Sequence, residues 1–511
     1  MAGLDGSILE AIDADSVLEH IKFDVRTDFI FAPHLDAIFS EAGIEVWHRS
    51  VELLRSGRYE PGLPFTMSVP KGRGYTRPGT ILSPVDRFVY QALINLVTPV
   101  LDDQLDRSRV FSYPILPFDR NPSQSAHECW LSFQNVIRDL CSAGEYIMKA
   151  DIANYFERIP QHHLVNLMRA AGCLPEAVNL LEEMLLAFRG RNSFGIVQGV
   201  FPSDVLGDFY LSDLDAYFEL TQVRSARYND DIYLQYGTRL EAQRGLVTLI
   251  ERLRKNGLHL NEFKSGIQDA HDIIREETEV ESLFKAAREE IRDELVLQFS
   301  GYGFSADWEI DEETDEVIRL EAVERLYKAI EEYPEQAEKI EKFCLPVLRS
   351  ARSTSAIDSV LNRLIQNGHL ARLYHSYLSR FVYDQPELGK ELEKIVLGDD
   401  LVTDYEKMFL LSSLFNTKKA KYNTINRTLL WLTSTNQTAE ETRAIAAIFA
   451  AKHGNANQKR AVLLAYEDEP SEYVRSAILF SSQFMTSVEK KTCIRAWGGH
   501  SMLNTLTAQA M

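Results

Sequence analysis

The chain has 511 residues, of which 45% are hydrophobic and 25% charged, so it is globular and long enough for two or three domains. Its formal net charge of −20 argues against a protein that grips a long duplex through many phosphate contacts. No apolar stretch approaches membrane-spanning length, and the amino terminus lacks a signal-peptide pattern. The five cysteines show no Cys-x-x-Cys spacing, so we expect free thiols in a cytoplasmic protein without a membrane partner.

The charge is unevenly distributed along the chain. Residues 271–320 hold 16 acidic and 5 basic side chains, whereas residues 51–90 hold six basic and three acidic ones. The basic segment has the local balance that a phosphate contact needs. The acidic segment is more simply explained as a solvated surface.

Residues 146–151 are predicted to form a strand that delivers Asp151 at its end, with a helix beginning after Ile159-Pro160. The loop that follows, Gly195 to Gly199, allows the backbone to approach a bound nucleotide closely. Ser203 is the predicted start of the next helix, because serine caps helix amino termini. An isolated loop and helix start of this kind would be ordinary structure.

Tyr228-Asn-Asp230-Asp231 lies inside an apolar, strand-like run. Since side chains alternate faces along a strand, at least one carboxylate is expected to face inward, where a metal ion would offset its charge. A tight turn is the alternative, because Asn and Asp favour turns. Asp151 decides between the two readings, because carboxylates from two strands can converge on a pair of Mg²⁺ ions for phosphoryl transfer.

An amphipathic helix is predicted over residues 240–256, and Gly257 ends it. The segment Gly257-Leu-His-Leu-Asn261-Glu-Phe-Lys264-Ser265 follows, with a single lysine. Taken alone, Lys264 would be a solvated surface residue.

In this order the motifs resemble the palm of reverse transcriptases: Asp151 with Phe156, then Gln198-Gly199, then Tyr-x-Asp-Asp, then Lys264. Upstream, the segment from Arg77 through Pro84, Asp86 and Arg87 resembles the fingers motif of bacterial and group-II-intron-like enzymes, and residues 110–113 resemble the patch after it. The resemblance covers residues 50–270. It implies an α+β fingers–palm domain over residues 1–270 that joins nucleotides.

The resemblance also assigns roles to individual residues. It implies that Asp151, Asp230 and Asp231, with the carbonyl of Ile152, bind Mg²⁺ or alternatively Mn²⁺. Phe156 would exclude a ribose 2′-hydroxyl, although core packing explains it equally simply. Lys264 would neutralise or protonate the leaving pyrophosphate. The remaining nucleotide-binding residues would be Lys71, Arg73, Arg77, Gln198 and Gly199. Positioning and charge neutralisation are what phosphoryl transfer requires, and these residue types provide both.

Three positions depart from the reverse transcriptase pattern. Val197 replaces the usual proline before the glutamine, Asp204 replaces the proline after Ser203, and Asp208 replaces an asparagine. Beyond them, Ser112-Tyr113 continues as Pro-Ile-Leu-Pro rather than Gly-Phe-Arg-Pro. These changes lie where template and nucleotide are held, so we predict intact chemistry with weakened or absent template dependence.

Residues 271–511 are predicted to be entirely α-helical. Helix starts at Thr438-x-x-Glu441, Ser471 and Thr486-x-x-Glu489, with another near Asn457, are about fifteen residues apart. That spacing favours stacked helical hairpins such as HEAT-like repeats, and an irregular helical bundle is the alternative.

A reverse transcriptase domain followed by a helical domain in place of a thumb resembles the abortive-infection reverse transcriptases of bacteria, the AbiK and AbiA type and their prophage-encoded relatives. This resemblance implies antiphage defence by a homo-oligomer that makes DNA from dNTPs without a template. It also implies a protein primer, so that the single-stranded DNA product stays covalently attached. Two alternatives remain open: a templated, retron-like enzyme working with a dedicated RNA, and a nucleic-acid-binding scaffold with a vestigial palm.

Overall fold

The structure is a computed structural model that describes residues 6–25, 28–114, 126–273, 282–289 and 312–511. Its internal contacts divide the chain into two units. We call the first the sheet unit; it comprises Met1–Met67, Pro78–Ile274 and Ile494–Met511. The second, the helical unit, comprises Ser68–Arg77 and Arg275–Cys493. No helix among the described residues is long and apolar enough to cross a membrane.

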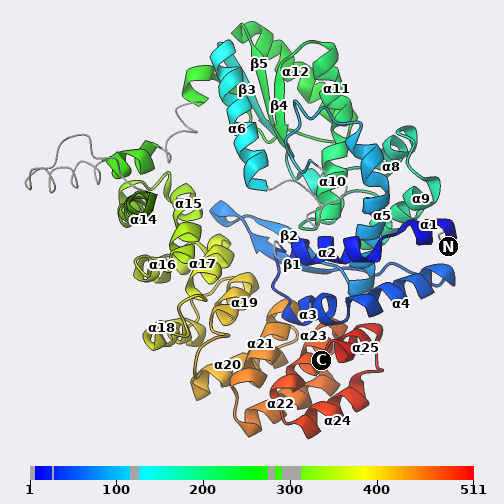
Figure 1. Ribbon diagram of the computed structural model, residues 1–511, viewed down its shortest axis with the longest axis vertical. Coiled ribbons are helices and arrows are strands. Elements are labelled where there is room, and N and C mark those ends of the chain that lie inside the picture. The colour runs from blue at the N-terminus through cyan, green and yellow to red at the C-terminus, as the bar shows by residue number, and fades with distance from the viewer. Residues whose placement is uncertain (1–5, 26–27, 115–125, 274–281, 290–311) are drawn as a thin grey trace, which may run out of the picture. The chain divides into compact units, whose positions relative to one another are not determined.

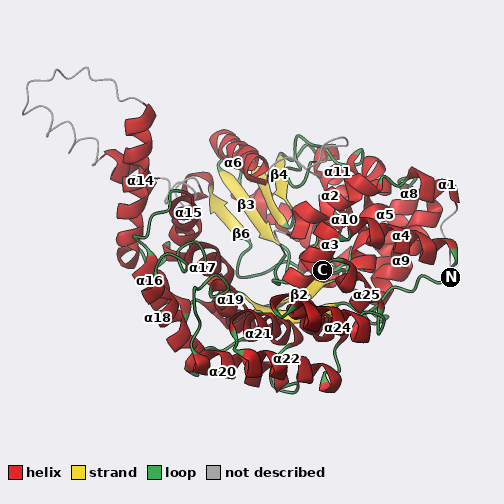
Figure 2. Ribbon diagram, turned by 60° about the horizontal axis from the view of Figure 1, so that its bottom comes forward, coloured by secondary structure: helices red, strands yellow, loops and turns green. Residues whose placement is uncertain are grey.

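The sheet unit is built on a four-stranded sheet in the order β4-β5-β3-β6, in which all paired neighbours are antiparallel (Figures 1 and 2). The strands are β3 (Tyr146–Asp151), β4 (Ser225–Tyr228), β5 (Asp231–Tyr236) and β6 (Gly266–Asp269). Adjacent residues of a strand point to opposite faces. Ile147 and Met148 of β3 are both fully buried, so both faces of the sheet are covered.

Helix α6 (Ala126–Ala143) covers the face of the sheet that carries Ile147 and Tyr233, where Phe133 and Ile137 form a shared apolar core with them. Helix α12 (Arg239–Lys255) packs against β3, β5 and β6. It begins with a reciprocal capping box between Thr238 and Glu241, and Gly257 follows it at φ 73°. The predicted helix over residues 240–256 is therefore confirmed.

The other helices of the sheet unit pack beside the sheet, and α5 (Pro84–Asp102) lies at their centre. Helices α2, α3, α4, α9 and α10 all contact it, and α25 (Met502–Gln509) packs on α3 and α4. The bounds of the remaining helices are α1 (Gly6–Ala11), α2 (Ala14–Asp24), α3 (Pro33–Glu41), α4 (Gly43–Arg55), α7 (Tyr155–Arg158), α8 (Gln161–Ala170), α9 (Pro175–Phe188), α10 (Phe201–Tyr210) and α11 (Ser212–Leu220).

Helix α10 corrects one prediction. It begins at Phe201 with Pro202 in its first turn, so Ser203 lies inside the helix rather than capping it. Proline favours this position because its missing N–H would have no partner there. The Ser203 side chain is buried and shares a 3.0 Å hydrogen bond with the Tyr90 hydroxyl of α5.

Strands β1 (Phe65–Pro70) and β2 (Thr76–Ile81) form a separate two-stranded sheet. The tip of this hairpin, Ser68–Arg77, belongs to the helical unit. A Cβ atom on Gly72 would lie 3.8 Å from the Glu338 carboxylate and 3.9 Å from the His369 ring. The tip therefore rests against this part of the helical unit.

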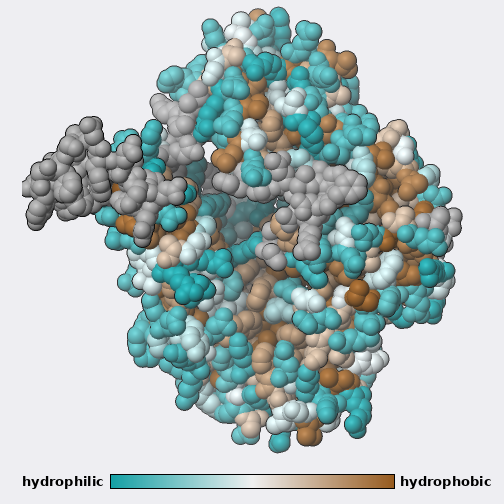
Figure 3. Space-filling view, viewed as in Figure 1, coloured by the Kyte–Doolittle hydropathy of each residue, from teal (hydrophilic) through white to brown (hydrophobic). Residues whose placement is uncertain are grey.

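The helical unit stacks its helices in two sets. Helices α14, α15, α17, α19, α21 and α23 contact one another in that order, and so do α16, α18, α20 and α22. On the face drawn in Figure 3, the surface over α18 and α20 is predominantly hydrophilic. The bounds are α14 (Glu312–Lys328), α15 (Ala337–Ser350), α16 (Ile357–Leu364), α17 (Ala371–Leu378), α18 (Pro386–Leu397), α19 (Asp404–Ser413), α20 (Tyr422–Thr433), α21 (Glu440–His453), α22 (Ala456–Asp468), α23 (Glu472–Ser481) and α24 (Ser487–Trp497). For the described residues of 271–511, the prediction of an all-helical region is confirmed.

Of the helix caps predicted in this region, those at Ser471 and Thr486 are confirmed and the one at Thr438 is wrong. Ser471 caps α23, and Thr486 and Glu489 form the expected reciprocal box at α24. The box predicted at Thr438 is wrong, because α21 begins at Glu440 after Ala439, without a side-chain cap. Thr438 is held instead in the preceding turn, where its N–H donates to the Ser434 carbonyl at 3.0 Å.

Candidate active site

Two of the three predicted metal-binding carboxylates are direct register partners. Asp151 ends β3 and pairs with Asp231, which begins β5, so the two side chains leave neighbouring strands at the same end of the sheet. Asp230 precedes Asp231 in the two-residue turn after Tyr228. Asn229 adopts φ 53° there, a left-handed conformation that asparagine tolerates. The sequence offered a tight turn and a carboxylate site as alternative readings of Tyr228 to Asp231. In the structure this segment is a turn, and the same turn places Asp230 and Asp231 beside Asp151.

The Asp151 carboxylate is held by the segment that leads into β6. Lys264 Nζ lies 3.1 Å from one carboxylate oxygen, and the Asn261 side-chain amide donates to the other at 2.9 Å. The backbone is fixed as well, because Asp151 N–H donates to Ser265 Oγ and its carbonyl accepts from Asn261 N–H. Lys264, read from the sequence as a surface residue when taken alone, is exposed over two thirds of its side chain and still reaches the site.

Burial and neighbouring negative charge raise the pKa of Asp230 and of Asp231. Burial, followed by the negative charge of Asp231, raises the pKa of Asp230 to about 6; Asp151 adds to this, while a backbone hydrogen bond and Lys264 act in the opposite direction. Burial and then Asp151 also raise the pKa of Asp231, while Lys149 and Lys264 act in the opposite direction. The site therefore carries more negative charge than its protein neighbours compensate.

The donors at this site are all oxygens, which Mg²⁺ and Mn²⁺ prefer. Within the described ranges, no three metal-ligating side chains are already gathered around a common centre. Asp151 instead engages Lys264 and Asn261. The uncompensated charge and the donor chemistry fit a divalent cation held by Asp151, Asp230, Asp231 and the Ile152 carbonyl, with the exposed Lys264 side chain giving way.

A buried arginine holds the Asn229-Asp230 turn through a hydrogen bond to its backbone. Arg227 is 1% exposed, pairs with Asp208 at 2.8 Å and Asp215 at 2.6 Å, and donates to the Asn229 carbonyl at 3.1 Å. The hydroxyl of Ser112 donates to Asp208 and accepts from the Asn229 N–H at 3.0 Å. Sequence reasoning missed this network. Its available signals were Arg227 beside Tyr228 and the departure at Asp208, which here serves as the arginine's partner.

Phe156 and the Gln198-Gly199 loop lie next to helix α10. The Phe156 ring is 9% exposed, stands edge-on to Tyr155, and lies so close to α10 that a Cβ on Gly207 would approach it to 3.0 Å. Gly199 adopts φ 95°, and any Cβ there would collide with Phe29 at 2.6 Å. Among the described residues, the half-buried Gln198 side chain has no hydrogen-bond partner.

The amino-terminal helices support the same loop, which the sequence did not reveal. Asp24, at the end of α2, accepts a 3.0 Å hydrogen bond from the Phe201 N–H that begins α10. Arg87 of α5 fixes Asp24 at 2.9 Å and Asp28 at 2.6 Å, and all three side chains are buried. The carboxylate also suits the positive end of the α10 dipole. The start of α10, directly after Gln198-Gly199, is thereby anchored.

The structure divides the predicted site residues between the two units. Asp151, Ile152, Phe156, Gln198, Gly199, Asp230, Asp231 and Lys264 belong to the sheet unit. Lys71, Arg73 and Arg77 belong to the hairpin tip in the helical unit. Lys71 and Arg77 are half-buried, and the Arg73 side chain lies outside the described part of the chain. Their role in triphosphate binding stays a prediction.

Residues 69–282 match the family model for reverse transcriptases, RNA-dependent DNA polymerases. The chain therefore contains a reverse transcriptase domain, which confirms that part of the sequence-based resemblance. The domain implies nucleotidyl transfer with nucleotide substrates, and enzymes of this family generally use a divalent metal ion. The relationship to abortive-infection enzymes stays a prediction.

Solved structures similar to this chain include two telomerases. One, from Candida albicans with a fragment of telomeric RNA, is 9% identical with TM-score 0.31, covering 87% of this chain and 70% of its own. The other, from Candida tropicalis without ligands, is 10% identical with TM-score 0.33, covering 91% and 73%. Similarity at this level carries no argument about function. The comparison with curated proteins finds no match.

Proposed function

We propose that this protein is a reverse-transcriptase-related DNA polymerase whose site is formed by Asp151, Asp230 and Asp231. The observation that carries the proposal is the register pairing of Asp151 with Asp231, with Asp230 in the adjoining turn. The match of residues 69–282 to the reverse transcriptase family supports the same reaction. The substrates are dNTPs, and the product is a DNA strand with pyrophosphate as the leaving group.

Divalent cations, when bound, supply positive charge that activates the attacking hydroxyl and offsets charge on the transferred phosphoryl group. The three aspartates hold that charge in place, and the hydrogen bonds of Asn261 and Ser265 keep Asp151 fixed. Lys264, already at the site, neutralises or protonates the leaving pyrophosphate. Phe156 and the Gln198-Gly199 loop contact the sugar and the incoming nucleotide, and Lys71, Arg73 and Arg77 contact the triphosphate.

The finer proposal is template-independent, protein-primed synthesis in antiphage abortive infection. The departures at Val197, Asp204 and Asp208 support it, because they alter the surroundings of the nucleotide loop and leave the carboxylates in place. Residues 271–511 then form a HEAT-like domain in place of a thumb, and residues 1–270 form the fingers and palm. The sequential packing of α15, α17, α19 and α21 supports stacked helical hairpins. The active form is a homo-oligomer.

The test is incorporation of each labelled dNTP by purified protein with Mg²⁺ and no added template or primer. Products are separated on a denaturing gel before and after proteinase treatment. Label that stays with the protein and runs as DNA only after proteolysis supports template-free, protein-primed synthesis. Strict complementarity to a supplied template contradicts it. The Asp230→Asn/Asp231→Asn variant is the control for contaminating polymerases.

A second candidate is an RNA-templated, retron-like enzyme that works with a dedicated RNA. The family to which residues 69–282 match is described as RNA-dependent, which favours this reading. It predicts an RNA that copurifies with the protein, and loss of incorporation after RNase treatment. Unchanged incorporation after RNase would exclude it.

A further inference from the structure

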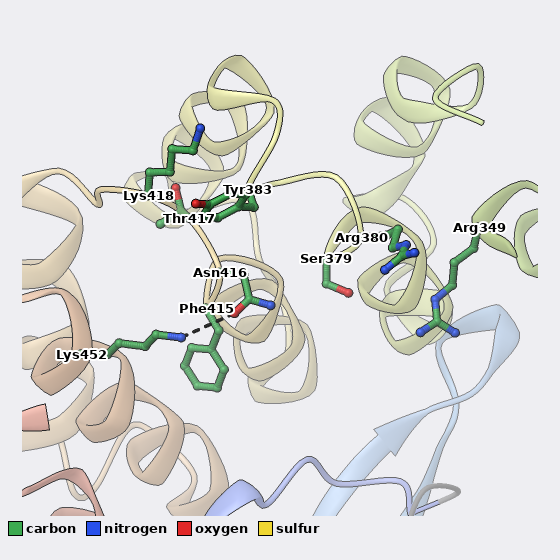
Figure 4. A pocket seen from close by; sticks show the side chains of 9 residues that line it. All are labelled: Arg349, Ser379, Arg380, Tyr383, Phe415, Asn416, Thr417, Lys418 and Lys452. Carbon is green, nitrogen blue, oxygen red and sulfur yellow. Dashed lines mark hydrogen bonds between the residues drawn. The ribbon is translucent and has the colours of Figure 1, made fainter. Parts of the chain in front are cut away.

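Four helices that alternate along the chain of the helical unit bring their carboxyl ends to one cavity of about 700 Å³ (Figure 4). Helices α15, α17, α19 and α21 pack on one another in that order. Each contributes one cation from its last turn or from the connection after it: Arg349, Arg380, Lys418 and Lys452. No Asp or Glu is among the described residues that line this cavity, although the whole chain carries a net charge of −20.

The positive charge of the cavity is not neutralised from within. In the described part of the chain, none of the four cations forms an ion pair, and Arg349, Arg380 and Lys418 are exposed to solvent. Lys452 Nζ lies 3.5 Å from the Asn416 side-chain oxygen, a neutral partner. Burial, followed by Arg349 and Arg372, lowers the pKa of the adjacent His375 to about 4. The cavity therefore presents unpaired positive charge to which an anionic ligand can bind.

Aromatic rings lie among the cations. Lys418 Nζ stands 4.8 Å from the centre of the Tyr383 ring, and Tyr383 is 56% exposed. Lys452 Nζ lies 5.9 Å from the Phe415 ring. Figure 4 shows Tyr383 beside Lys418, with Phe415 between Asn416 and Lys452. Alternating cations and aromatic faces are the combination that binds single-stranded nucleic acid, because phosphates pair with the cations while unpaired bases stack on the rings.

Stabilisation of helix ends is a simpler explanation for basic residues at these positions, because cations near a helix carboxyl terminus offset the helix dipole. It accounts for Arg349 and Lys452, which lie in the last turns of α15 and α21. Arg380 and Lys418 lie beyond the ends of α17 and α19, in the connections to the next helices. Helix stabilisation therefore leaves half of the cluster unexplained.

We propose that this cavity, which we call the cationic groove, binds the phosphate backbone of a single-stranded nucleic acid, with a base stacked on Tyr383. Packed helices lie about 8–10 Å apart, so the three steps from Arg349 to Lys452 span roughly 25–30 Å. That reach exceeds a mononucleotide and suits a polymer. The groove belongs to the helical unit and requires none of the three active-site aspartates, so the inference goes beyond the proposed polymerase activity.

The test is fluorescence anisotropy of a labelled oligothymidylate, long enough to span the groove, with the full-length protein. The groove variant replaces Arg349, Arg380, Lys418 and Lys452 by Ala. The matched control replaces Arg319, Lys328, Arg460 and Lys491 by Ala. These residues are exposed and belong to the same unit, and replacing them removes the same amount of charge as the groove variant does. We expect the groove variant to bind at least about tenfold more weakly, with a salt slope reduced by about 3, since each lost phosphate contact lowers it by roughly 0.7–1. The control should change less than about twofold.

Two further arms separate the sources of the ligand. Tyr383→Ala should weaken oligonucleotide binding about five- to a hundredfold, because a stacked base contributes on that scale. Inorganic phosphate and dTTP should displace the oligonucleotide poorly, and so should a duplex of the same length. Displacement by phosphate or dTTP as effectively as by oligonucleotide would overturn the proposal in favour of a small-anion site. Equal competition by duplex would overturn the single-strand assignment.

Two controls distinguish a failure of the polymerase proposal from a failure of the cationic-groove proposal. In the Asp230→Asn/Asp231→Asn background, which removes the proposed polymerase activity, the four groove substitutions should still weaken oligonucleotide binding at least about tenfold. Photocrosslinking with an iododeoxyuridine oligonucleotide should label a peptide containing Tyr383, and labelling confined to the sheet unit would refute the groove. If the groove variant loses helicity by circular dichroism, the pair Arg349→Lys/Arg380→Lys serves instead. This pair keeps the charge and should retain most binding, whereas Arg349→Gln/Arg380→Gln should lose it.

Discussion

Replacing Arg227 by leucine should release the turn that carries Asp230. Arg227 makes paired bonds to the Asp215 carboxylate at 2.6–3.1 Å. It also donates to the Asp208 carboxylate at 2.8 Å, to the Asp208 carbonyl at 3.0 Å and to the Asn229 carbonyl at 3.1 Å. Its removal leaves buried Asp215 without an ion-pair partner among the described residues, and leaves buried Asp208 with only the more distant Arg107 at 3.6 Å. Breaking a buried pair in this way costs about 3–5 kcal/mol.

The assay is hydrogen exchange of the peptide that covers β4 and β5, read by mass spectrometry. Since 1.36 kcal/mol corresponds to tenfold, we expect protection of this peptide to fall by about two to three and a half orders of magnitude. The matched control is Arg169→Leu, because Arg169 is 40% exposed and pairs with Glu182 at the surface, where a salt bridge contributes about 1 kcal/mol or less.

The defect should depend on pH. Burial raises the pKa of Asp215, and without Arg227 nothing of its strength opposes that effect, so the folded state binds more protons than the unfolded one and stability falls as pH rises. The loss should therefore be larger at pH 8 than at pH 5. Asp208→Asn and Asp215→Asn in the Arg227→Leu background should restore part of the protection. Wild-type protection of this peptide in Arg227→Leu would refute the supporting role of the network.

Three other predictions concern selectivity, catalysis and pH. Phe156→Ala should raise ribonucleotide incorporation relative to deoxynucleotide, and unchanged selectivity would leave Phe156 with only its packing against Gly207. Lys264→Gln should lower kcat about a hundredfold or more with little change in KM, as expected for lost proton donation, and kcat within twofold of wild type would exclude that role. Glu441 is buried, and burial raises its pKa to about 7, so its ionisation destabilises the helical unit as pH rises from about 4.5 to 7. Glu441→Gln should thus stabilise it by up to about 3 kcal/mol at pH 8 and little at pH 5, measured by thermal unfolding beside the exposed control Glu472→Gln, and an equal effect at both pH values would contradict this.

The meeting of Asp151 with the Tyr228–Asp231 segment was predictable from the sequence, because these residues form short, recognisable motifs. Tyr228 to Asp231 and Asp151 are recognisable by type and order, and the antiparallel register of β3 with β5 then places Asp151 opposite Asp231. Lys264 was predicted by motif alone. Its 3.1 Å contact with Asp151 depends on the turn before β6.

The supporting network could not be predicted, because its partners are chosen by packing across long separations. Ser112 lies 117 positions from Asn229, yet its hydroxyl accepts the Asn229 N–H. Asp208 was noticed only as a departure from the family pattern. Its role emerges once α10 brings it to Arg227.

Two helix caps that were predicted from residue type alone are wrong, because other residues determine where those helices begin. Thr438 and Ser203 both have the residue types of helix caps. In the structure Pro202 lets α10 begin at Phe201, and the turn before Ala439 holds Thr438. The cationic groove could not be predicted from the sequence, because its cations are spread over the ends of four helices.

The central claim is that Asp151, Asp230 and Asp231 carry out nucleotidyl transfer, and Mg²⁺-dependent dNTP incorporation by single Asp→Asn variants tests it most directly. The matched control is Asp269→Asn, an exposed carboxylate of β6 at the far end of the same sheet, paired with Tyr146. Each site variant should lose at least about a thousandfold in rate, because the charge stabilisation at stake is several kcal/mol. Asp269→Asn should keep wild-type activity. Incorporation that survives in Asp230→Asn at the wild-type rate would contradict the assignment.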